Sequence, residues 1–418
     1  MSSHDPPAEK HSPYAAFHYP SYRKFMAGAL LVLMGTQIQR VAIGWEMYVR
    51  TNDPMALGMV GLVQALPMLL LSLPGGYLAD RFDRRKILML SMAGATLTSA
   101  GLALLSWKQG SLTLMYVLLL LDASVLNLGR PARTALLPRL VPSHIFENAV
   151  TWRSSMFQLS AVFGPAIGGF IIAQNIPAAY VICACTSICY IFFLWRLKFH
   201  NEGEKHVLTE SPIKSLMEGL RFVLNARLVL VTISLDLFAV LLGGAVYLLP
   251  IFARDILKVG EEGLGWLQAA PAVGALTMAL ILAHLPPMRH AGRNLLLAVA
   301  GFGVATIIFG LSKSFWLSMV MLFLTGALDN ISVVVRHTLV QMLTPDKMRG
   351  RVSAVNSVFI GSSNELGGFE SGLVARLFSP VISVVSGGIG TILVVGAMAL
   401  ASPRLRRFGS LRDAKPED

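Results

Sequence analysis

The chain has 418 residues, of which 14% are charged, whereas an average soluble domain carries roughly 25% charged residues. So few charges cannot cover the surface of a soluble globule of this size, and the mean hydropathy of +0.62 agrees. A water-soluble enzyme is therefore excluded, as is a disordered or collagen-like chain, which needs high charge or a glycine repeat. The composition predicts a protein with several transmembrane helices.

Runs of about 20 mostly apolar residues, the length of a transmembrane helix, recur along the whole chain. They predict twelve spans, near residues 25–48, 57–78, 87–106, 112–133, 150–173, 177–195, 228–250, 264–283, 294–311, 316–335, 353–375 and 380–401. The longest polar stretch, at 196–227, leaves six spans on each side of it. We therefore expect an all-α membrane protein that consists of two six-helix bundles.

The segments outside the two bundles are short and polar. The predicted division is a tail at 1–20, a first bundle at 21–195, a linker at 196–227, a second bundle at 228–402 and a tail at 403–418. No apolar run with a cleavage site opens the chain, so we expect no removable signal peptide. In the linker, helical spacing predicts a helix on the membrane surface, with an ordinary linker helix as the alternative; its apolar residues are Ile213, Leu216, Met217, Leu220, Val223 and Leu224.

An internal repeat relates the two predicted bundles. At an offset of 204, the matched residues are Gly61, Gln64, Ala65 and Pro67 with Gly265, Gln268, Ala269 and Pro271. At an offset of 203, they are Asn127, Arg133, Leu136, Leu140, Pro142, Gly164 and Gly169 with Asn330, Arg336, Leu339, Leu343, Pro345, Gly367 and Gly372. Because six is even, both halves cross the membrane in the same sense, as parallel repeats require. Two such bundles can rock about a site between them.

Positive charge is unevenly distributed between the two sides of the predicted membrane. Of the 35 Lys and Arg residues, Arg40 lies inside a span and six lie in connections on one side: Arg50, Lys108, Arg254, Lys258, Lys313 and Arg376. The others lie on the opposite side, which the positive-inside pattern assigns to the cytoplasm together with both termini. We attribute the net charge of +12 to this pattern, and a groove for nucleic acid is the alternative.

The sequence carries no pattern typical of an enzyme or a metal site. The three cysteines, Cys183, Cys185 and Cys189, share one span, so no disulfide framework is expected. Cys185 and Cys189 share a helix face, but no His or acidic residue accompanies them as a metal ligand. The motifs of phosphate loops, zinc proteases and serine hydrolases are absent. We therefore expect neither catalytic residues nor a cofactor.

The strongest local pattern follows the second span, where residues 75–86 have the sequence GGYLADRFDRRK. Small residues let two helices approach closely, and an acid beside several bases can form a latch that opens when the bundles move. A solvated turn would explain the bases but not the Gly and Asp. The segment resembles motif A of the major facilitator superfamily, with matches at Gly76, Leu78, Ala79, Asp80, Arg81, Arg84 and Arg85, whereas Asp83 replaces the usual glycine.

This resemblance implies the major facilitator fold, with twelve transmembrane helices in two pseudo-symmetric bundles and both termini in the cytoplasm. It also implies that the motif forms a cytoplasmic gate. Asp80 would help to hold the inner side closed against the eleventh span and against a base at the end of the fourth span. Arg130 and Arg133 are the candidates for that base.

A second pattern lies in the fifth span, where residues 164–169 have the sequence GPAIGG. Proline removes a helix hydrogen bond and glycine permits close contact, so a kinked and tightly packed helix is expected. Gly164, Pro165, Gly168 and Gly169 resemble the end of motif C, which is found in exporters of the superfamily. The earlier glycines of that motif are replaced by Thr151 and Ser160, and a generic glycine-rich packing face is the alternative.

Two longer stretches resemble the enterobactin-exporter-like branch of the superfamily, whose members are also called transmembrane secretion effectors. One runs from Gly35 to motif A, and the other from Asp329 to Gly372. The resemblance covers nearly the whole chain between residues 20 and 402 and implies a secondary transporter.

Ionisable residues inside spans suggest function, because a charge at the bilayer centre costs on the order of 2.5–3.5 kcal/mol or more. Three acids lie near the middle of their spans and are candidates for proton coupling: Asp122, Asp329 and Glu365. In this superfamily spans 1, 4, 7 and 10 line the central cavity, so the resemblance places Asp122, Asp329 and Arg40 there. The candidates for contact with the cargo are Gln39, Arg40, Asn127 and Asn330.

Each of these assignments has an alternative. Asp329 could form a structural ion pair with Arg336, two turns along the same helix face. Arg40 could bind an anionic cargo or neutralise Asp122, and Glu365 could belong to the packing that meets motif A. Glu46 and Asp236 lie nearer the ends of their spans, where side chains reach water more easily.

These features predict a secondary transporter in the bacterial cytoplasmic membrane that exports a small amphiphilic molecule, such as a siderophore or a drug, in exchange for protons. The expected partners are this small molecule, protons and membrane lipid, but not nucleic acid, and the expected state is a monomer. Lysophospholipid transport and uptake are alternatives within transport. A scaffold or sensor is the alternative from another class, although it would need neither a latch nor a titratable group.

Overall fold

The computed structural model describes residues 12–197, 212–286, 288–406 and 408–409, and nearly all of them are helical. In this part of the chain, eleven helices are long and apolar enough to cross a membrane. The prediction of an all-helical protein with many spans is therefore confirmed. The remaining predicted span, the eleventh in chain order, is the 29-residue helix α13 (Arg349–Leu377), which packs among the others but carries more polar and charged residues.

The first half contains six long helices, and three short 3₁₀ turns lie at their ends. The helices are α1 (Pro20–Thr51), α2 (Pro54–Arg81), α3 (Arg84–Trp107), α4 (Leu112–Leu136), α5 (Phe146–Gln174) and α6 (Ile176–Trp195). The turns are η1 (Ala15–His18), η2 (Leu137–Arg139) and η3 (Ser143–Ile145). Asp83 caps α3 by accepting a hydrogen bond from the Arg85 amide at 2.8 Å. An aspartate at the usual glycine position of motif A therefore starts the next helix.

The second half follows α7 (Pro212–Asn225), which occupies the described end of the linker, whereas residues 198–211 lie outside the description. Its remaining helices are α8 (Arg227–Leu242), α10 (Gly260–His284), α11 (Ala291–Leu311), α12 (Phe315–Leu343), α13, α14 (Pro380–Ala401) and the short α15 (Pro403–Arg406). The seventh span is interrupted after Leu242. It continues as η4 (Gly244–Leu248), α9 (Leu249–Ile251) and a π-helical segment, η5 (Phe252–Ile256).

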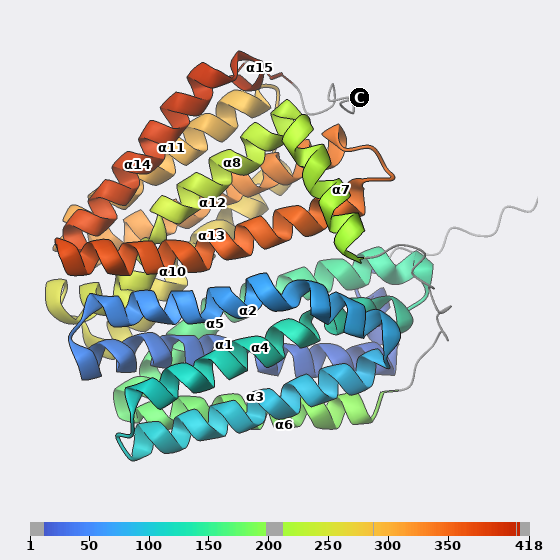
Figure 1. The fold of residues 1–418 in the computed structure, drawn as a ribbon, viewed down its shortest axis with the longest axis vertical. Coiled ribbons are helices and arrows are strands. Elements are labelled where there is room, and N and C mark those ends of the chain that lie inside the picture. Colours follow the sequence, from blue (N-terminus) through green and yellow to red (C-terminus); the bar gives the residue numbers. More distant parts are fainter. Residues whose placement is uncertain (1–11, 198–211, 287, 407, 410–418) are drawn as a thin grey trace, which may run out of the picture.

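The two halves form separate bundles that touch along two helix pairs, α2 with α13 and α5 with α10 (Figure 1). Glycines make both contacts close. A Cβ on Gly265 of α10 would lie 2.9 Å from the Gly169 Cα atom of α5, and one on Gly372 of α13 would lie 2.5 Å from the Gly58 Cα atom of α2. Gly169 and Gly372 are matched by the sequence repeat, so equivalent helices of the two halves use equivalent small residues.

The two ends of the molecule differ in how the halves meet. We call the end with the α1–α2, α3–α4 and α5–α6 connections the joined end, and the opposite end, near residues 12 and 409, the terminal end. At the joined end one buried apolar cluster contains residues of both halves, including Trp45 and Leu264. At the terminal end each half has a cluster of its own. Among the described residues, a buried apolar cluster shared by both halves is therefore found at the joined end and not at the terminal end.

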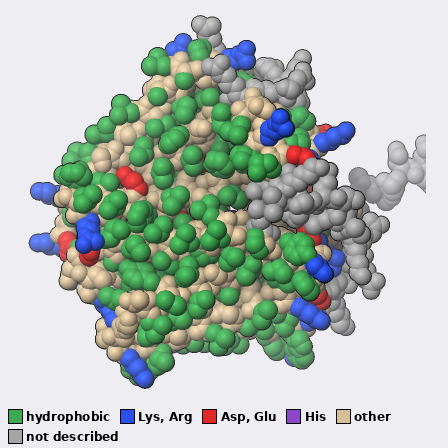
Figure 2. Space-filling model, in the orientation of Figure 1, with side chains coloured by type: hydrophobic (Ala, Val, Ile, Leu, Met, Phe, Trp, Pro, Cys, Tyr) green, Lys and Arg blue, Asp and Glu red, His purple; other side chains and the backbone are tan. Residues whose placement is uncertain are grey.

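The outer surface fits the apolar interior of a membrane. Figure 2 shows hydrophobic side chains spread over most of one face, with Lys and Arg side chains mainly near its edges. Large apolar side chains on several long helices are well exposed, among them Leu90, Leu97, Leu393 and Leu400. A protein dissolved in water seldom exposes apolar surface on this scale.

Candidate functional site

A cavity of about 190 Å³ lies between the two halves, next to the apolar cluster of the joined end. Its walls come from α1, α2, α4 and α13. The polar side chains that line it are Thr36, Gln39, Arg40, Gln64, Asp122, Asn127, Arg130 and Glu365. All of these except Glu365 belong to the first half. The structure thus brings five of the seven predicted coupling and cargo residues to one cavity and leaves out Asp329 and Asn330.

Asp122 on α4 is held in this cavity by uncharged donors. The Thr98 hydroxyl of α3 donates to Asp122 Oδ1 at 2.6 Å, and the Gln39 amide of α1 donates to Asp122 Oδ2 at 3.3 Å. Ser99 in turn donates to Gln39 Oε1 at 2.8 Å, which fixes the orientation of the amide. These contacts orient the carboxyl group without cancelling its charge, and the side chain is only 8% exposed. Asp122 can therefore gain or lose a proton without breaking an ion pair.

Glu365 on α13 faces the same cavity from the second half. The Tyr247 hydroxyl of η4 donates a hydrogen bond to Glu365 Oε2. Arg40 is near enough for its charge to act on Glu365, although the two form no ion pair within the described residues. The Glu365 backbone also belongs to the α2–α13 contact, because a Cβ on Gly61 would lie 2.6 Å from its carbonyl oxygen. Glu365 thus takes part in both the cavity and the packing.

The second half holds a different cluster of buried charges. Arg336 of α12 forms an ion pair with Asp236 of α8, and both side chains are almost fully buried. Asp329 lines a separate cavity of about 20 Å³ together with Asp236 and Ser332. The guanidinium of Arg336 is thus bonded to Asp236, and the described residues contain no ion pair between Arg336 and Asp329. Asn330 likewise lies away from the central cavity, and its buried side-chain oxygen has no hydrogen-bond partner among the described residues.

Motif A lies at the terminal end, and its acid pairs within its own segment. Asp80 forms an ion pair with Arg84 at 3.7 Å, and Arg84 also donates to the Ala79 and Ala135 carbonyl oxygens. Arg81 lies over the Tyr77 ring, Arg85 donates to the Trp195 carbonyl, and the buried Arg133 Nε has no described partner. Neither Arg130 nor Arg133 is paired with Asp80 in this structure.

The close helix contact at motif A is made by the first of its two glycines. A Cβ on Gly75 would lie 3.3 Å from the Asn127 carbonyl oxygen of α4, whereas a Cβ on Gly76 would meet nothing within 4 Å. A second cavity, of about 500 Å³, lies between this part of α2, α4 and α13. Gly76 and Asp80 both line it. Motif A therefore borders open space rather than a packed contact with α13.

The glycines of the GPAIGG segment place α5 tightly between α1 and α10. A Cβ on Gly164 would lie 2.5 Å from the Gln37 Cβ atom, and one on Gly168 would lie 3.2 Å from the Ile38 Cα atom. Gly169 faces Gly265 of α10, and a Cβ on Gly265 would also lie 2.7 Å from the Pro165 carbonyl oxygen. Close packing thus explains all three glycines.

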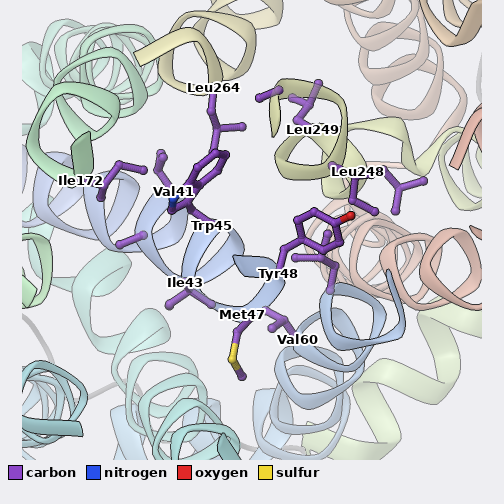
Figure 3. Close-up of a cluster of buried hydrophobic side chains, with 14 of the residues drawn as sticks. Val41, Ile43, Trp45, Met47, Tyr48, Val60, Ile172, Leu248, Leu249 and Leu264 are labelled. Carbon is purple, nitrogen blue, oxygen red and sulfur yellow. The ribbon is translucent and has the colours of Figure 1, made fainter. Parts of the chain in front are cut away.

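Contacts between the halves close the cavity toward the joined end. Figure 3 shows Trp45 of α1 beside Leu264, and Tyr48 of α1 directed toward Leu248. The Tyr48 hydroxyl donates to Asp255, and Arg254 donates to Asn52 Oδ1 at 2.7 Å. Sequence reasoning did not identify Tyr48, Asp255 or Tyr247, because these residues come together only when the two halves pack.

Comparison with known proteins agrees with this architecture. The transmembrane secretion effector family, a branch of the major facilitator superfamily, matches residues 11–417. The chain belongs to this family. It is therefore a membrane transporter and not an enzyme, as the sequence predicts.

Relatives and solved structures of known proteins support the same assignment. The enterobactin exporters of Shigella boydii serotype 18 and of Escherichia coli O1:K1 are each 26% identical over 392 residues, which cover 93% of this chain and 94% of theirs. A D-xylose–proton symporter matches with a TM-score of 0.70 and 12% identity, over 91% of this chain and 97% of its own. A bacterial homologue of the transporter Spinster matches with a TM-score of 0.69 and 14% identity, over 98% of this chain and 100% of its own.

Proposed function

We propose that this transporter exports a small amphiphilic molecule, such as a siderophore or a drug, from the cytoplasm in exchange for protons. The observation that carries the proposal is the central cavity, which holds titratable side chains and is closed at the joined end by packing between the halves. Export is supported by the relatives, which are named enterobactin exporters. The motif C-like segment of α5 points in the same direction.

The proposed topology has twelve spans, namely the eleven apolar helices together with α13, and both termini in the cytoplasm. Support for α13 as a span comes from its length of 29 residues and from its close glycine contacts with α2. The distribution of Lys and Arg assigns the terminal end to the cytoplasm. The protein would then lie in the bacterial cytoplasmic membrane, as a monomer, with the cavity accessible to cargo from inside the cell.

Transport would proceed by alternating access. The halves would first meet at the terminal end, where Asp80 lies across the second cavity from α13. They would then part at the joined end, where Tyr48, Asp255, Arg254 and Asn52 would separate. Rigid bundles with tight internal packing favour such rocking, because packed helices switch between discrete arrangements rather than deform.

We propose Asp122 as the main coupling residue, with Glu365 as a second one. Both line the cavity and are bonded to uncharged donors, so each can release a proton when the cavity opens to the other side. Asp329 has a weaker case, because it lies in the separate cavity beside Asp236.

The test is a pH-gradient assay in inside-out vesicles that contain the purified protein, with enterobactin as the first compound. With the native protein, we expect the added compound to dissipate the pH gradient. With Asp122→Asn, we expect the response to fall to the level of empty vesicles. Asp329→Asn is the matched comparison, because it removes a carboxylate of a long apolar helix that lies outside the cavity.

Two results would contradict the proposal. An unchanged response in Asp122→Asn and Glu365→Gln would exclude coupling through the cavity acids. A response in right-side-out vesicles alone would indicate uptake instead of export.

A further inference from the structure

The central cavity and the second cavity are bordered by the same side chains at one place. The central cavity and the second cavity at the terminal end share three lining residues: Met68 of α2, and Asn127 and Arg130 of α4. The second cavity is the larger, at about 500 Å³ against about 190 Å³. A molecule that entered between α2, α4 and α13 would therefore pass these three side chains before it reached Asp122.

The two arginines that line these cavities form no ion pair within the described residues, although Arg40 is near enough for its charge to act on Glu365. Arg130 is exposed to both cavities, and Arg40 lines the central one. Within the described ranges, neither guanidinium takes part in an ion pair or a side-chain hydrogen bond. The acid in the second cavity, Asp80, is already paired with Arg84.

The acids of the central cavity do not form an ion pair with either arginine among the described residues. Asp122 is bonded to Thr98 and Gln39, and Glu365 is bonded to Tyr247. Other basic groups near the junction add to the positive charge, since the charge of Arg133 acts on Arg130. A guanidinium offers a planar set of donors that matches a carboxylate, sulfonate or phosphate group. Two such groups without an ion pair, Arg40 inside the first span and Arg130 near the end of the fourth, favour an anionic ligand.

The rest of the second cavity is mainly apolar. Its walls include Met68, Ala79, Pro131, Ala135, Ala354 and Val358, with a few hydroxyl groups such as Ser72 and Ser357. Such a surface suits the apolar body of a ligand whose charged group lies at Arg130. An inorganic anion would leave these apolar walls in contact with water.

We propose that the cargo is an amphiphilic anion, that Arg130 and Arg40 bind its acidic group, and that it reaches them through the second cavity between α2, α4 and α13. This inference rests on the proposed function, since it names the chemical class of the cargo at the same site. The inference goes beyond the proposed function because it assigns the charge of the cargo, two residues that bind the cargo and a route to them.

The test uses two fluorescent probes that share one apolar skeleton. These are 1-anilinonaphthalene-8-sulfonate, which is anionic, and N-phenyl-1-naphthylamine, which is neutral. Binding is measured to the full-length protein in nanodiscs of zwitterionic phosphatidylcholine, with empty nanodiscs subtracted. We expect Arg130→Gln to weaken binding of the anionic probe about tenfold or more, the effect of losing one charge-assisted hydrogen bond, and to leave the neutral probe unchanged.

Two further variants separate recognition from damage to the fold. Arg130→Lys keeps the positive charge and should recover part of the lost affinity. Arg293→Gln removes an exposed guanidinium that lines neither cavity and should bind both probes as the native protein does. Because the neutral probe reports an intact cavity in every variant, equal binding of the anionic probe by Arg130→Gln and the native protein would overturn the inference.

The route is tested by narrowing the second cavity from α13. Ala354→Trp places a large ring in its wall, whereas Leu373→Trp adds the same ring to an exposed position of α13 outside it. We expect Ala354→Trp alone to slow association of the anionic probe about tenfold or more. Equal association rates in the two variants would exclude this route.

The outcomes also separate this inference from the proposed function. Anionic binding through Arg130 without any response in the vesicle assay would support the anion site and contradict coupled export. Coupled export with no preference for the anionic probe would support the transporter and contradict the anion site.

Discussion

The two halves of the molecule arise from one repeat, yet the buried charged residues of the corresponding helices α4 and α12 have different partners. In the first half, Asp122 faces the central cavity and is bonded only to neutral groups. In the second half, Arg336 forms a buried ion pair with Asp236, and Asp329 lies beside it in a small cavity. Arg133 is the repeat counterpart of Arg336, but its buried Nε has no described partner.

The origin of this difference can be read from the helices that face the two arginines. The positions of the first half that lie 203 and 204 residues before Asp236 are Leu33 and Val32, which carry no charge. The two halves do share their helix packing, because equivalent glycines make the α2–α13 and α5–α10 contacts. The charge chemistry is specific to each half. The first half provides most of the lining of the central cavity, and the second half contributes Glu365.

The largest expected effect comes from breaking the buried ion pair of the second half. Arg336→Leu leaves Asp236 without its partner, and a lone buried charge of this kind costs about 3–5 kcal/mol of stability. The measurement is the shift of the denaturation midpoint of the purified protein in mild detergent. The counterpart Arg133→Leu, which breaks no described ion pair, should shift the midpoint far less.

A double variant provides the control for this prediction. In Asp236→Leu/Arg336→Leu both charges are gone, so most of the lost stability should return. If the double variant is as unstable as Arg336→Leu, shape rather than charge explains the loss.

A smaller effect is expected where the halves are alike. Gly265→Ala places a Cβ 2.7 Å from the Pro165 carbonyl oxygen and 2.9 Å from the Gly169 Cα atom, so the α5–α10 backbones must move apart. Overpacking of this kind costs about 1–3 kcal/mol. Gly372→Ala should cost a similar amount at the α2–α13 contact, because its Cβ would lie 2.5 Å from the Gly58 Cα atom.

Gly76→Ala is the matched control, since its Cβ would meet nothing within 4 Å. Alanine favours a helix over glycine by up to about 1 kcal/mol, so this variant should be as stable as the native protein or slightly more. Thermal unfolding followed by size-exclusion chromatography measures all three variants. Equal behaviour of Gly265→Ala and Gly76→Ala would argue against close packing between the halves.

The smallest expected effect is at the exposed ion pair of the first half. The distance from Arg84 Nη2 to Asp80 Oδ1 is 3.7 Å, and both side chains are partly exposed to solvent. Ion pairs of this kind contribute about 0–1 kcal/mol to the free energy of unfolding. Arg84→Gln should therefore change stability by less than about 1 kcal/mol, in contrast to Arg336→Leu. A loss as large as that of Arg336→Leu would mean that the hydrogen bonds to Ala79 and Ala135 hold the turn together.

Much of the fold could be predicted from periodicity and composition. Long apolar runs locate the helices within a few residues, because a segment in a membrane must satisfy its backbone hydrogen bonds internally. The interruption of the seventh span after Leu242 was not predicted, since Gly243 and Gly244 lie inside an apolar run that looks continuous. The helix caps show a similar limit: Asp83 looked like a departure from motif A, but it starts α3.

The candidate site was predicted less completely. Asp122, Gln39, Arg40, Asn127 and Glu365 line the cavity, and each stood out as a polar residue within an apolar span. Asp329 met the same criterion but lies elsewhere, because polarity within a span does not reveal the direction in which the side chain points. Tyr247 was missed because a tyrosine in an apolar segment gives no signal until Glu365 is placed beside it.

The sequence by itself determined the helical membrane architecture, the repeat and the small residues on which close helix contact depends. These properties follow from local chemistry, since hydrophobicity, helix length and residue size act within a single segment. Only the tertiary structure decided which charged residues form ion pairs, which face the cavity, and that Arg130 lines two cavities. Such choices depend on the rotation of each helix about its axis and on the packing of segments far apart in the chain, such as Asp236 and Arg336, which are 100 residues apart.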